Sequence, residues 1–303
     1  MATKNIKGIV LAGGKGTRLY PLTISTSKHL LAVYDKPMIY YPISVLMLSD
    51  IKEILIITNP EHLEIYKKLL GDGSQFGISI EYKSQEEPGG LAEAFIIGED
   101  FIGKDSVSLI LGDNLFYGQD FVPKLLKASQ NHGSTIFAYQ VKNPNKFGVA
   151  EINSDNKVLH IEEKPKNPRS NLAITGLYYF DNKVVERAKH IKISSRGEKE
   201  IVDLIQTYLD DGELNAEILS RGFAWLDTGS YDSLQDAGQF IQTIENRQGL
   251  KVACLEEISF YKGWISREEL FETGKKLEQT SYGKYLIKIS ETKKSATGVK
   301  ESK

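Results

Sequence analysis

The stretch KGIVLAGGKGTRLYP, Lys7 to Pro21, decides how the chain begins to fold. Its apolar run Ile9-Val10-Leu11-Ala12 predicts a buried parallel strand, and the glycines of Gly13-Gly14-Lys15-Gly16 let the backbone turn tightly and present bare N–H groups. Together with the nearby cations of Lys15 and Arg18, and that of Lys28 farther on, such a loop is suited to a polyphosphate. An ordinary strand-to-helix turn with solvated basic side chains explains the same residues, and this stretch alone does not decide between the two.

Two common nucleotide-binding motifs are absent from this stretch. A phosphate loop of the form G-x-x-x-x-G-K-[ST] needs Ser or Thr after its lysine, whereas Gly16 follows Lys15. The dinucleotide fingerprint G-x-G-x-x-G fits Gly14 and Gly16 but finds Leu19 at the third place. The identity of the anion must therefore come from the rest of the chain.

Composition narrows the class of protein. The chain has 303 residues, 41% of them hydrophobic, and a formal net charge of −2, so nothing favours nucleic acid or a membrane surface as a partner. It has a single cysteine, Cys254, and lacks both a signal-peptide core and an apolar run of about 18 residues, which predicts a soluble, cytoplasmic protein without an internal disulfide. No H-x-x-x-H pair argues for zinc, and no G-x-S-x-G elbow argues for a serine nucleophile.

Apolar runs alternate with helical patterns along the first half of the chain. Strands are expected at 6–11, 53–58, 78–82, 106–111 and 134–141, and helices at 39–48, 60–70, 91–98 and 121–131. This alternation predicts an α/β fold with a mainly parallel sheet covered by helices. Shorter strands at 149–152, 158–162 and 175–180, before helices resume near Lys183 and Ile201, predict a second lobe inserted on the sheet.

Two acids follow apolar runs. Asp113 comes after the strand ending at Leu111, at the edge of the sheet where open α/β folds bind ligands, and a metal ligand fits that place. Asp227 follows a shorter apolar run. A turn explains Asp113 and a helix cap explains Asp227 equally simply, and the sequence does not say that the two meet.

Lys164 and Gln85 also allow two interpretations. Lys164 follows two acids and precedes a proline, which suits a salt-bridged surface turn as well as a rigid phosphate ligand. Gln85 leads into a helix, where its amide is either an ordinary surface group or a partner for a pyrimidine edge.

Six motifs occur in order over residues 6–290, and together they resemble the sugar-1-phosphate nucleotidyltransferases. They are Leu11 to Pro21 (LAGGKGTRLYP), Tyr34 to Pro42 (YDKPMIYYP), Leu111 to Asn114 (LGDN), Glu162 to Pro165 (EEKP), Thr175 to Tyr178 (TGLY) and Trp225 to Gly229 (WLDTG). The resemblance implies a Rossmann-like doubly wound mixed sheet with an inserted sugar-binding lobe. It further implies transfer of a thymidylyl group from dTTP to α-D-glucose 1-phosphate, giving dTDP-glucose and pyrophosphate for deoxysugar and polysaccharide synthesis.

The resemblance also assigns roles to residues. Arg18 and Lys28 neutralise the departing phosphates, Asp113 and Asp227 bind Mg²⁺, and Lys164 grips the sugar phosphate, which needs no strong base because its second pKa is about 6. The residues assigned to the two substrates are Leu11, Ala12, Gly13, Gly14, Gly16, Thr17, His29, Gln85, Gly90, Phe147, Gly148, Glu163, Ile174 and Gly176. A homotetramer is implied as well.

The chain departs from the family pattern at three places. Relatives usually read SKQLLP where this chain has SKHLLA, with His29 in place of Gln, and often read Pro-Asp-Gly where it has Pro88-Gly89-Gly90. The family's feedback site maps to Tyr117, Gly118, Glu257 and Ile258, but Gln119 and Tyr261 replace the usual His and Arg, which argues against feedback inhibition by a deoxysugar nucleotide.

The implied domain spans 1–290, with a nucleotide-binding core over about 1–145, a sugar-binding part over about 146–230 and a C-terminal helical part over about 231–290. Residues 291–303 are expected to form a disordered tail. Within the same class, a UTP-dependent enzyme or one acting on another hexose 1-phosphate stays open, because thymine and uracil differ by one methyl group. From another class, a non-catalytic nucleotide-sugar sensor is the alternative.

Overall fold

The first predicted strand lies inside a nine-stranded sheet. The computed structural model describes residues 5–87 and 89–292. In it β1 (Ile6–Ala12) is paired in parallel with β4 (Glu53–Thr58) on one side and β6 (Ser106–Leu111) on the other, and β5 (Ser79–Ser84) extends the parallel part beyond β4. The predicted parallel core is confirmed.

The remaining strands of the sheet join the parallel core through β11 (Leu172–Phe180). β11 runs antiparallel to β6 and to β8 (Ser134–Gln140), and β12 (Leu214–Leu219) runs parallel to β8. β9 (Gly148–Ile152) and β10 (Val158–Glu163) form the far edge, in the order β10-β9-β11-β6-β1-β4-β5. The sheet is mixed, as predicted.

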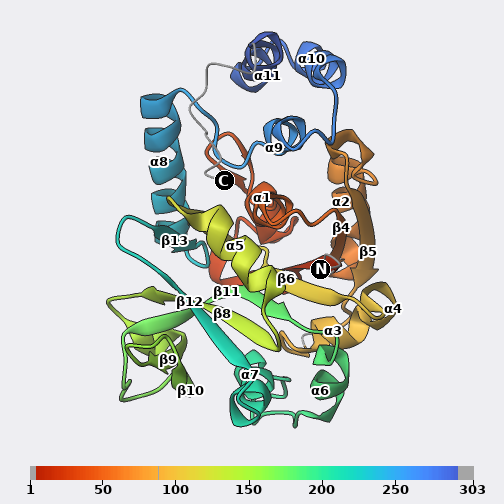
Figure 1. Ribbon diagram of the computed structural model, residues 1–303. Coiled ribbons are helices and arrows are strands. Elements are labelled where there is room, and N and C mark those ends of the chain that lie inside the picture. Colours follow the sequence, from red (N-terminus) through yellow and green to blue (C-terminus); the bar gives the residue numbers. More distant parts are fainter. Residues whose placement is uncertain (1–4, 88, 293–303) are drawn as a thin grey trace.

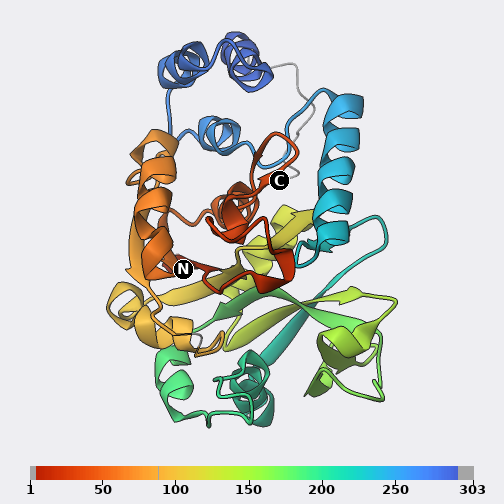
Figure 2. The same cartoon turned by 180° about the vertical axis from the view of Figure 1, so that it is seen from behind.

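Helices cover both faces of the sheet because the inner strands are apolar on both faces. On β1, Val10 and Ala12 pack on the side of α1, α2 and α5, while Ile9 and Leu11 pack on the side of α3, α4, α6 and α7 (Figures 1 and 2). The helices are α1 (Tyr40–Leu48), α2 (Leu63–Leu70), α3 (Glu93–Ile97), α4 (Glu99–Ile102), α5 (Phe121–Gln130), α6 (Val184–His190), α7 (Ile201–Asp210), α8 (Tyr231–Gln248), α9 (Leu255–Tyr261), α10 (Arg267–Lys276) and α11 (Ser281–Glu291).

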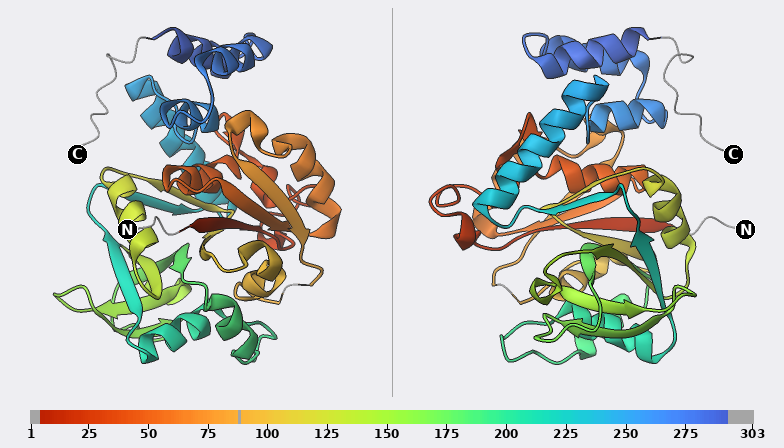
Figure 3. Two further views of the ribbon diagram at one scale, coloured as in Figure 1. Left: turned by 45° about the vertical axis from the view of Figure 1, so that its right-hand side comes forward. Right: turned by 90° about the vertical axis from the view of Figure 1, so that its left-hand side faces the viewer.

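The C-terminal helices α9 to α11 lie at the opposite end of the molecule from β9, β10 and α7 (Figure 3). They enclose a small apolar core of their own, and α9 also packs on α1. In the described ranges, no helix combines the length and apolar character needed to cross a membrane. Most of the predicted tail, residues 293–303, lies outside the described residues.

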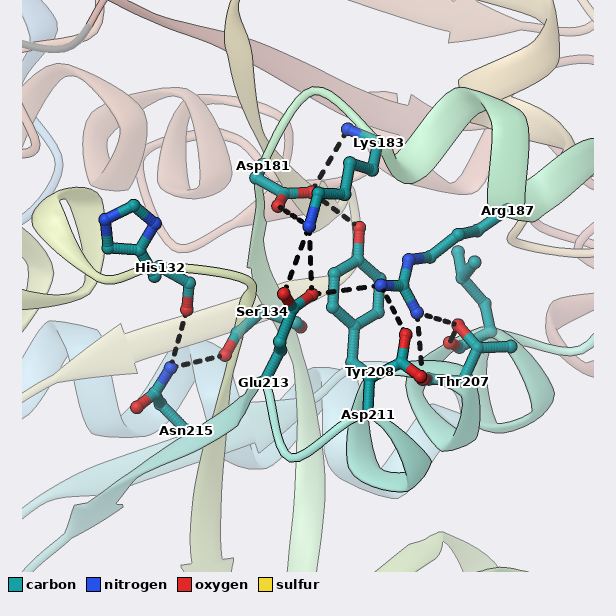
Figure 4. A network of polar contacts seen from close by, with 11 residues as sticks. His132, Ser134, Asp181, Lys183, Arg187, Thr207, Tyr208, Asp211, Glu213 and Asn215 are labelled. Atoms are coloured by element: carbon teal, nitrogen blue, oxygen red, sulfur yellow. Dashed lines mark hydrogen bonds and ion pairs between the residues drawn. The ribbon is translucent and has the colours of Figure 1, made fainter.

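Polar contacts fix the corner between α6, α7 and the start of β12 (Figure 4). We call Asp181, Lys183, Arg187, Asp211 and Glu213 the corner network. Glu213 accepts hydrogen bonds from Lys183 Nζ (3.0 and 3.3 Å) and Arg187 Nη2 (2.9 Å), and Arg187 also pairs with Asp211 at 2.8 Å. Each cation of the corner network thus has a carboxylate partner within the fold.

Candidate active site

The glycine loop follows β1 directly. Gly14 and Gly16 adopt left-handed conformations (φ +92° and +59°), and the Gly14 amide donates to Oδ1 of Asn59 at 2.9 Å. The loop runs into a short 3₁₀ helix, Thr17–Leu19, which the buried Leu19 anchors while Thr17 stays exposed. The strand, turn and cation that the sequence predicts are therefore present in that order.

Arg18 lies beside Asp227. A Cβ added at Gly229 would lie 3.1 Å from both Nη2 of Arg18 and Oδ1 of Asp227, so these two groups flank that glycine. Among the described residues, no carboxylate lies within ion-pair distance of Arg18 or of Lys15, the other cation of the loop. Both cations are available to an anionic ligand.

Asp113 is held just beyond the end of β6. Its carboxylate pairs with the ammonium of Lys28 and accepts a hydrogen bond from Nδ2 of Asn114 at 3.0 Å. Burial is the largest single effect and opposes ionisation of Asp113, but the positive charge of Lys28 together with the hydrogen bonds from Lys28 and Asn114 keeps the pKa of this carboxyl below its usual value. Asp113 is therefore an anion at neutral pH.

A two-stranded ribbon brings Asp227 to Asp113. β7 (Asn114–Tyr117) pairs antiparallel with β13 (Ala224–Asp227), which places Asp227 opposite Asn114. The amide and hydroxyl of Thr228 donate to the Asp113 carbonyl at 3.2 and 2.9 Å. Burial and the negative charge of Asp113 raise the pKa of Asp227, although Lys28 and Arg18 oppose this. We call Arg18, Lys28, Asp113 and Asp227 the active-site charge cluster.

Asp113 and Asp227 form a donor set that fits Mg²⁺. Asp113 is buried and Asp227 is half-buried, and burial together with the negative charge of Asp113 raises the pKa of Asp227. No group of three or more Asp, Glu, His or Cys side chains suited to a metal gathers anywhere in the described residues. Mg²⁺ commonly takes one or two carboxylates together with phosphate oxygens and water, so two carboxylates beside a glycine loop and its cations fit this ion.

His29 lies beneath the end of β6 and is only 1% exposed. The His29 ring packs against Gly112, where an added Cβ would lie 2.6 Å from it. Nδ1 of His29 is 3.1 Å from Oγ of Ser27, and this Oγ is 2.8 Å from the Tyr66 hydroxyl. Burial, reinforced by the charge of Lys28, lowers the pKa of His29 to about 3. His29 is thus a neutral, packed side chain, and its assignment to the nucleotide stays a prediction.

Four of the residues assigned to the sugar lie together in the inserted lobe. A Cβ on Gly148 would lie 3.3 Å from Oε2 of Glu163 and 3.7 Å from Ile174. Phe147 precedes Gly148, and its ring packs at a tilt on Trp225 of the β7–β13 ribbon, with the ring centroids 5.1 Å apart. Gly176 lies nearer the charge cluster, where its amide donates to Oδ1 of Asn114 at 3.0 Å.

Lys164 lies in a salt-bridged turn, which agrees with the first of the two interpretations of its sequence. Its ammonium is 3.1 Å from Oε1 of Glu163, its side chain is 48% exposed, and its backbone is left-handed (φ +45°). Arg196 reaches the same Glu163 oxygen at 3.4 Å. A second cation therefore lies beside Lys164. No local pattern indicates it, because Arg196 belongs to a loop far along the chain.

Of the residues assigned to the base, Gln85 lies against the start of the glycine loop and Gly90 lies against Lys199. Gln85, only 9% exposed, follows β5, and its Oε1 would lie 3.2 Å from a Cβ on Gly13. Gly90 (φ +95°) packs against the backbone of Lys199: a Cβ added at Gly90 would lie 2.4 Å from the Lys199 carbonyl oxygen. Gln85 lines a pocket of about 320 Å³ together with Gly14, Lys15 and Asn59. Leu11 and Ala12 are the last two residues of β1, directly before Gly13.

The four possible regulatory residues form two separate pairs. Tyr117 ends β7 and its hydroxyl accepts a hydrogen bond from Gln248 at 2.8 Å, while Gly118 follows the strand and packs on Phe223. Glu257 lies on α9 with Ile258 and accepts a hydrogen bond from the Tyr285 hydroxyl at 2.8 Å. Within the part of the chain that is described, no hydrogen bond or ion pair joins one pair to the other.

Comparison with known proteins agrees with this geometry. A family model described as nucleotidyl transferase matches residues 7–244. Glucose-1-phosphate thymidylyltransferase of Neisseria meningitidis (serogroup A, serotype 4A) is 58% identical over 285 residues, 94% of this chain and 99% of that protein. The protein of the same name from Mycobacterium tuberculosis (strain H37Rv) is 50% identical over 286 residues, again 94% of this chain and 99% of that protein.

Two solved structures share the architecture. A crystal structure of a Bacillus anthracis protein assigned as a glucose-1-phosphate thymidylyltransferase, with bound sucrose, matches with a TM-score of 0.72 and 44% identity over 78% of this chain and 94% of that one. A UDP-glucose pyrophosphorylase with bound UDP-glucose matches with a TM-score of 0.68 over 79% of this chain and 99% of that one; its 23% identity indicates a shared fold. By the length of the family match and the identity of its relatives, the chain belongs to the nucleotidyl transferase family.

Proposed function

We propose that this chain transfers a thymidylyl group from dTTP to α-D-glucose 1-phosphate, releasing pyrophosphate and forming dTDP-glucose. The observation that carries the proposal is the convergence of two carboxylates, Asp113 and Asp227, with Arg18, which has no ion-pair partner among the described residues, at the end of a glycine loop. The high identity to proteins named glucose-1-phosphate thymidylyltransferase supports the choice of substrates.

The reaction needs charge stabilisation and positioning more than a base. The phosphate of glucose 1-phosphate is already largely a dianion at neutral pH, so it attacks the α-phosphorus of dTTP in line without losing a proton to the protein. Backbone N–H groups of Gly13 and Gly16, with Arg18 and Lys28, stabilise the negative charge that develops on the departing pyrophosphate. The Gly14 N–H would join them by exchanging its Asn59 acceptor for a phosphate oxygen. This accounts for a site without a nucleophilic side chain.

Lys164 and Arg196 hold the attacking phosphate. Both cations reach Glu163, so they are already directed to the sugar side of the site, and Glu163 accepts hydrogen bonds from sugar hydroxyls. Asp113 and Asp227 would hold Mg²⁺, which supplies a positive charge shared between phosphate oxygens. Lys28, paired with Asp113, keeps that carboxylate ionised and ready to bind the cation.

A panel of substrates tests the proposal. Pyrophosphate release is measured with Mg²⁺ and glucose 1-phosphate against dTTP, UTP, CTP, ATP and GTP, and then with dTTP against other hexose 1-phosphates. We expect dTTP to be preferred, with some use of UTP, because a methyl group contributes only about 1–3 kcal/mol of discrimination. A preference for UTP or for another sugar would revise the substrate, and no release with any pair would favour a nucleotide-sugar sensor.

Two further properties belong to this proposal. We infer a homotetramer in the cytoplasm, as the family resemblance implies, with the product feeding deoxysugar and polysaccharide synthesis. Sedimentation velocity of the purified protein tests the assembly. A monomer over the working concentration range would contradict it.

A further inference from the structure

We infer that Glu93 is a positioning residue that selects the pyrimidine, because it fixes the orientation of the Gln85 amide. The inference rests on the proposed function and extends it to how the base is read. Oε2 of Glu93 accepts a hydrogen bond from Nε2 of Gln85 at 2.5 Å. Among the described residues, Gln85 is the one hydrogen-bond partner of the Glu93 side chain, and no cation pairs with it.

The Glu93 carboxylate only accepts hydrogen bonds, so it determines which end of the Gln85 amide faces it. Gln85 has one donor end and one acceptor end, and an isolated amide can present either end by turning over. A carboxylate accepts hydrogen bonds but does not donate them, so Glu93 holds the NH₂ end of Gln85. The carbonyl end, Oε1, is left facing the glycine loop at Gly13, on the edge of the 320 Å³ pocket.

A fixed carbonyl distinguishes between pyrimidines. Thymine and uracil carry a hydrogen on N3, which can donate to Oε1 of Gln85. Cytosine has an unprotonated N3, an acceptor, which would face another acceptor and lose a hydrogen bond. A site that hydrogen-bonds to a polar group of the ligand strongly rejects analogues that lack this group. The geometry therefore predicts selection of thymine and uracil over cytosine.

Gly89 makes this arrangement possible. A Cβ at position 89 would lie 2.2 Å from Oε2 of Glu93, closer than any side chain allows. The glycine that departs from the family's usual Pro-Asp-Gly is thus the residue that leaves room for the Glu93 carboxylate. Gly89→Ala should displace Glu93 and reproduce, in weaker form, the loss of Glu93.

The experiment compares kcat/KM for dTTP and dCTP, each with glucose 1-phosphate, in wild type, Glu93→Ala and Glu93→Gln. We expect Glu93→Ala to lower the preference for dTTP about tenfold or more, through KM, while kcat with dTTP changes little. Glu93→Gln keeps the shape but can also donate, so its preference should fall by less. Glu87→Ala is the control: Glu87 lines the same pocket without contacting Gln85, so its loss should affect both nucleotides alike.

A double-mutant cycle separates an effect through Gln85 from a general disturbance of the loop. If Glu93 acts through Gln85, Glu93→Ala should not change the preference further in a Gln85→Ala background. Additive effects, or an unchanged preference in every folded Glu93 variant, would overturn the inference. Calorimetric titration with dTTP and dCTP alone measures the same preference without turnover, so a protein that binds selectively but never releases pyrophosphate would refute the proposed function and leave this inference standing.

Discussion

The corner network and the active-site charge cluster are both small groups of charged side chains, but their charges are balanced differently. In the corner network, Lys183 and Arg187 each reach Glu213, at 3.0 and 2.9 Å. In the active-site charge cluster, Lys28 pairs with Asp113, whereas Arg18 has no ion-pair partner in the described chain and the pKa of Asp227 is raised. The corner network satisfies its charges within the fold, and the active site keeps charges for a ligand.

This difference predicts opposite consequences for mutations. Removing a charge from the corner network should lower stability and leave turnover intact. Removing one from the active-site charge cluster should abolish or slow turnover and leave the fold intact, because residues retained for function often oppose stability. Three substitutions test this difference between the corner network and the active-site charge cluster.

Asp113→Asn should reduce turnover by about three powers of ten or more, because it removes a ligand for the cation and the partner of Lys28. The melting temperature should fall modestly, since the folded state favours the ionised form of Asp113 and Lys28 loses its partner, although relief of the repulsion on Asp227 offsets part of this loss. Pyrophosphate release and thermal unfolding measure the two effects. Asp100→Asn, at an exposed position, is the control, and a near wild-type rate for Asp113→Asn would remove the metal assignment.

Arg18→Ala should lower kcat/KM by about a hundredfold, the scale of one lost charge-stabilising donor in a transition state. Stability should be unchanged, because no described carboxylate loses an ion pair. Steady-state kinetics with dTTP varied and urea unfolding check both parts. The exposed Arg221→Ala serves as the matched control, and a marked loss of stability in Arg18→Ala would break the contrast between the two regions.

Glu213→Gln should destabilise the fold by about 1–2 kcal/mol, since Lys183 and Arg187 both lose a charged acceptor. Turnover should stay within twofold of wild type, because Glu213 belongs to the corner network rather than to the active site. Urea unfolding measures the difference against Glu186→Gln, whose ion pair with His190 is exposed and should matter less. Equal stability of the two variants would show that the corner network contributes little.

The sequence predicts the part of this molecule that depends on local pattern. β4 and β6 begin and end at the residues that their apolar runs indicate, because strands buried on both faces must be apolar throughout. The ribbon of β7 and β13 was not predicted, because it joins segments far apart in the chain whose pairing leaves no local signature. The meeting of Asp113 with Asp227 depends on that ribbon and so could not be read from either motif.

Two polar side chains were missed for a related reason. Arg196 and Glu93 act on Glu163 and Gln85 across contacts that only the fold creates. Their own surroundings in the sequence, a charged loop and the first turn of a helix, are ordinary. Gly89 was the one sequence feature that pointed to this region, because it departs from the family pattern and lies against the Glu93 carboxylate.

The β7–β13 ribbon also sets the order in which the site is completed during translation. Asp113 is synthesised 114 residues before Asp227 (227 − 113), and at about 5–20 residues per second that interval is roughly 6–20 s. During it the nascent chain has the glycine loop and one carboxylate, but neither Trp225 nor Thr228, whose hydrogen bonds hold Asn114 and the Asp113 backbone. A chain still short of β13 therefore cannot assemble both carboxylates, so catalytic competence awaits the second strand of the ribbon.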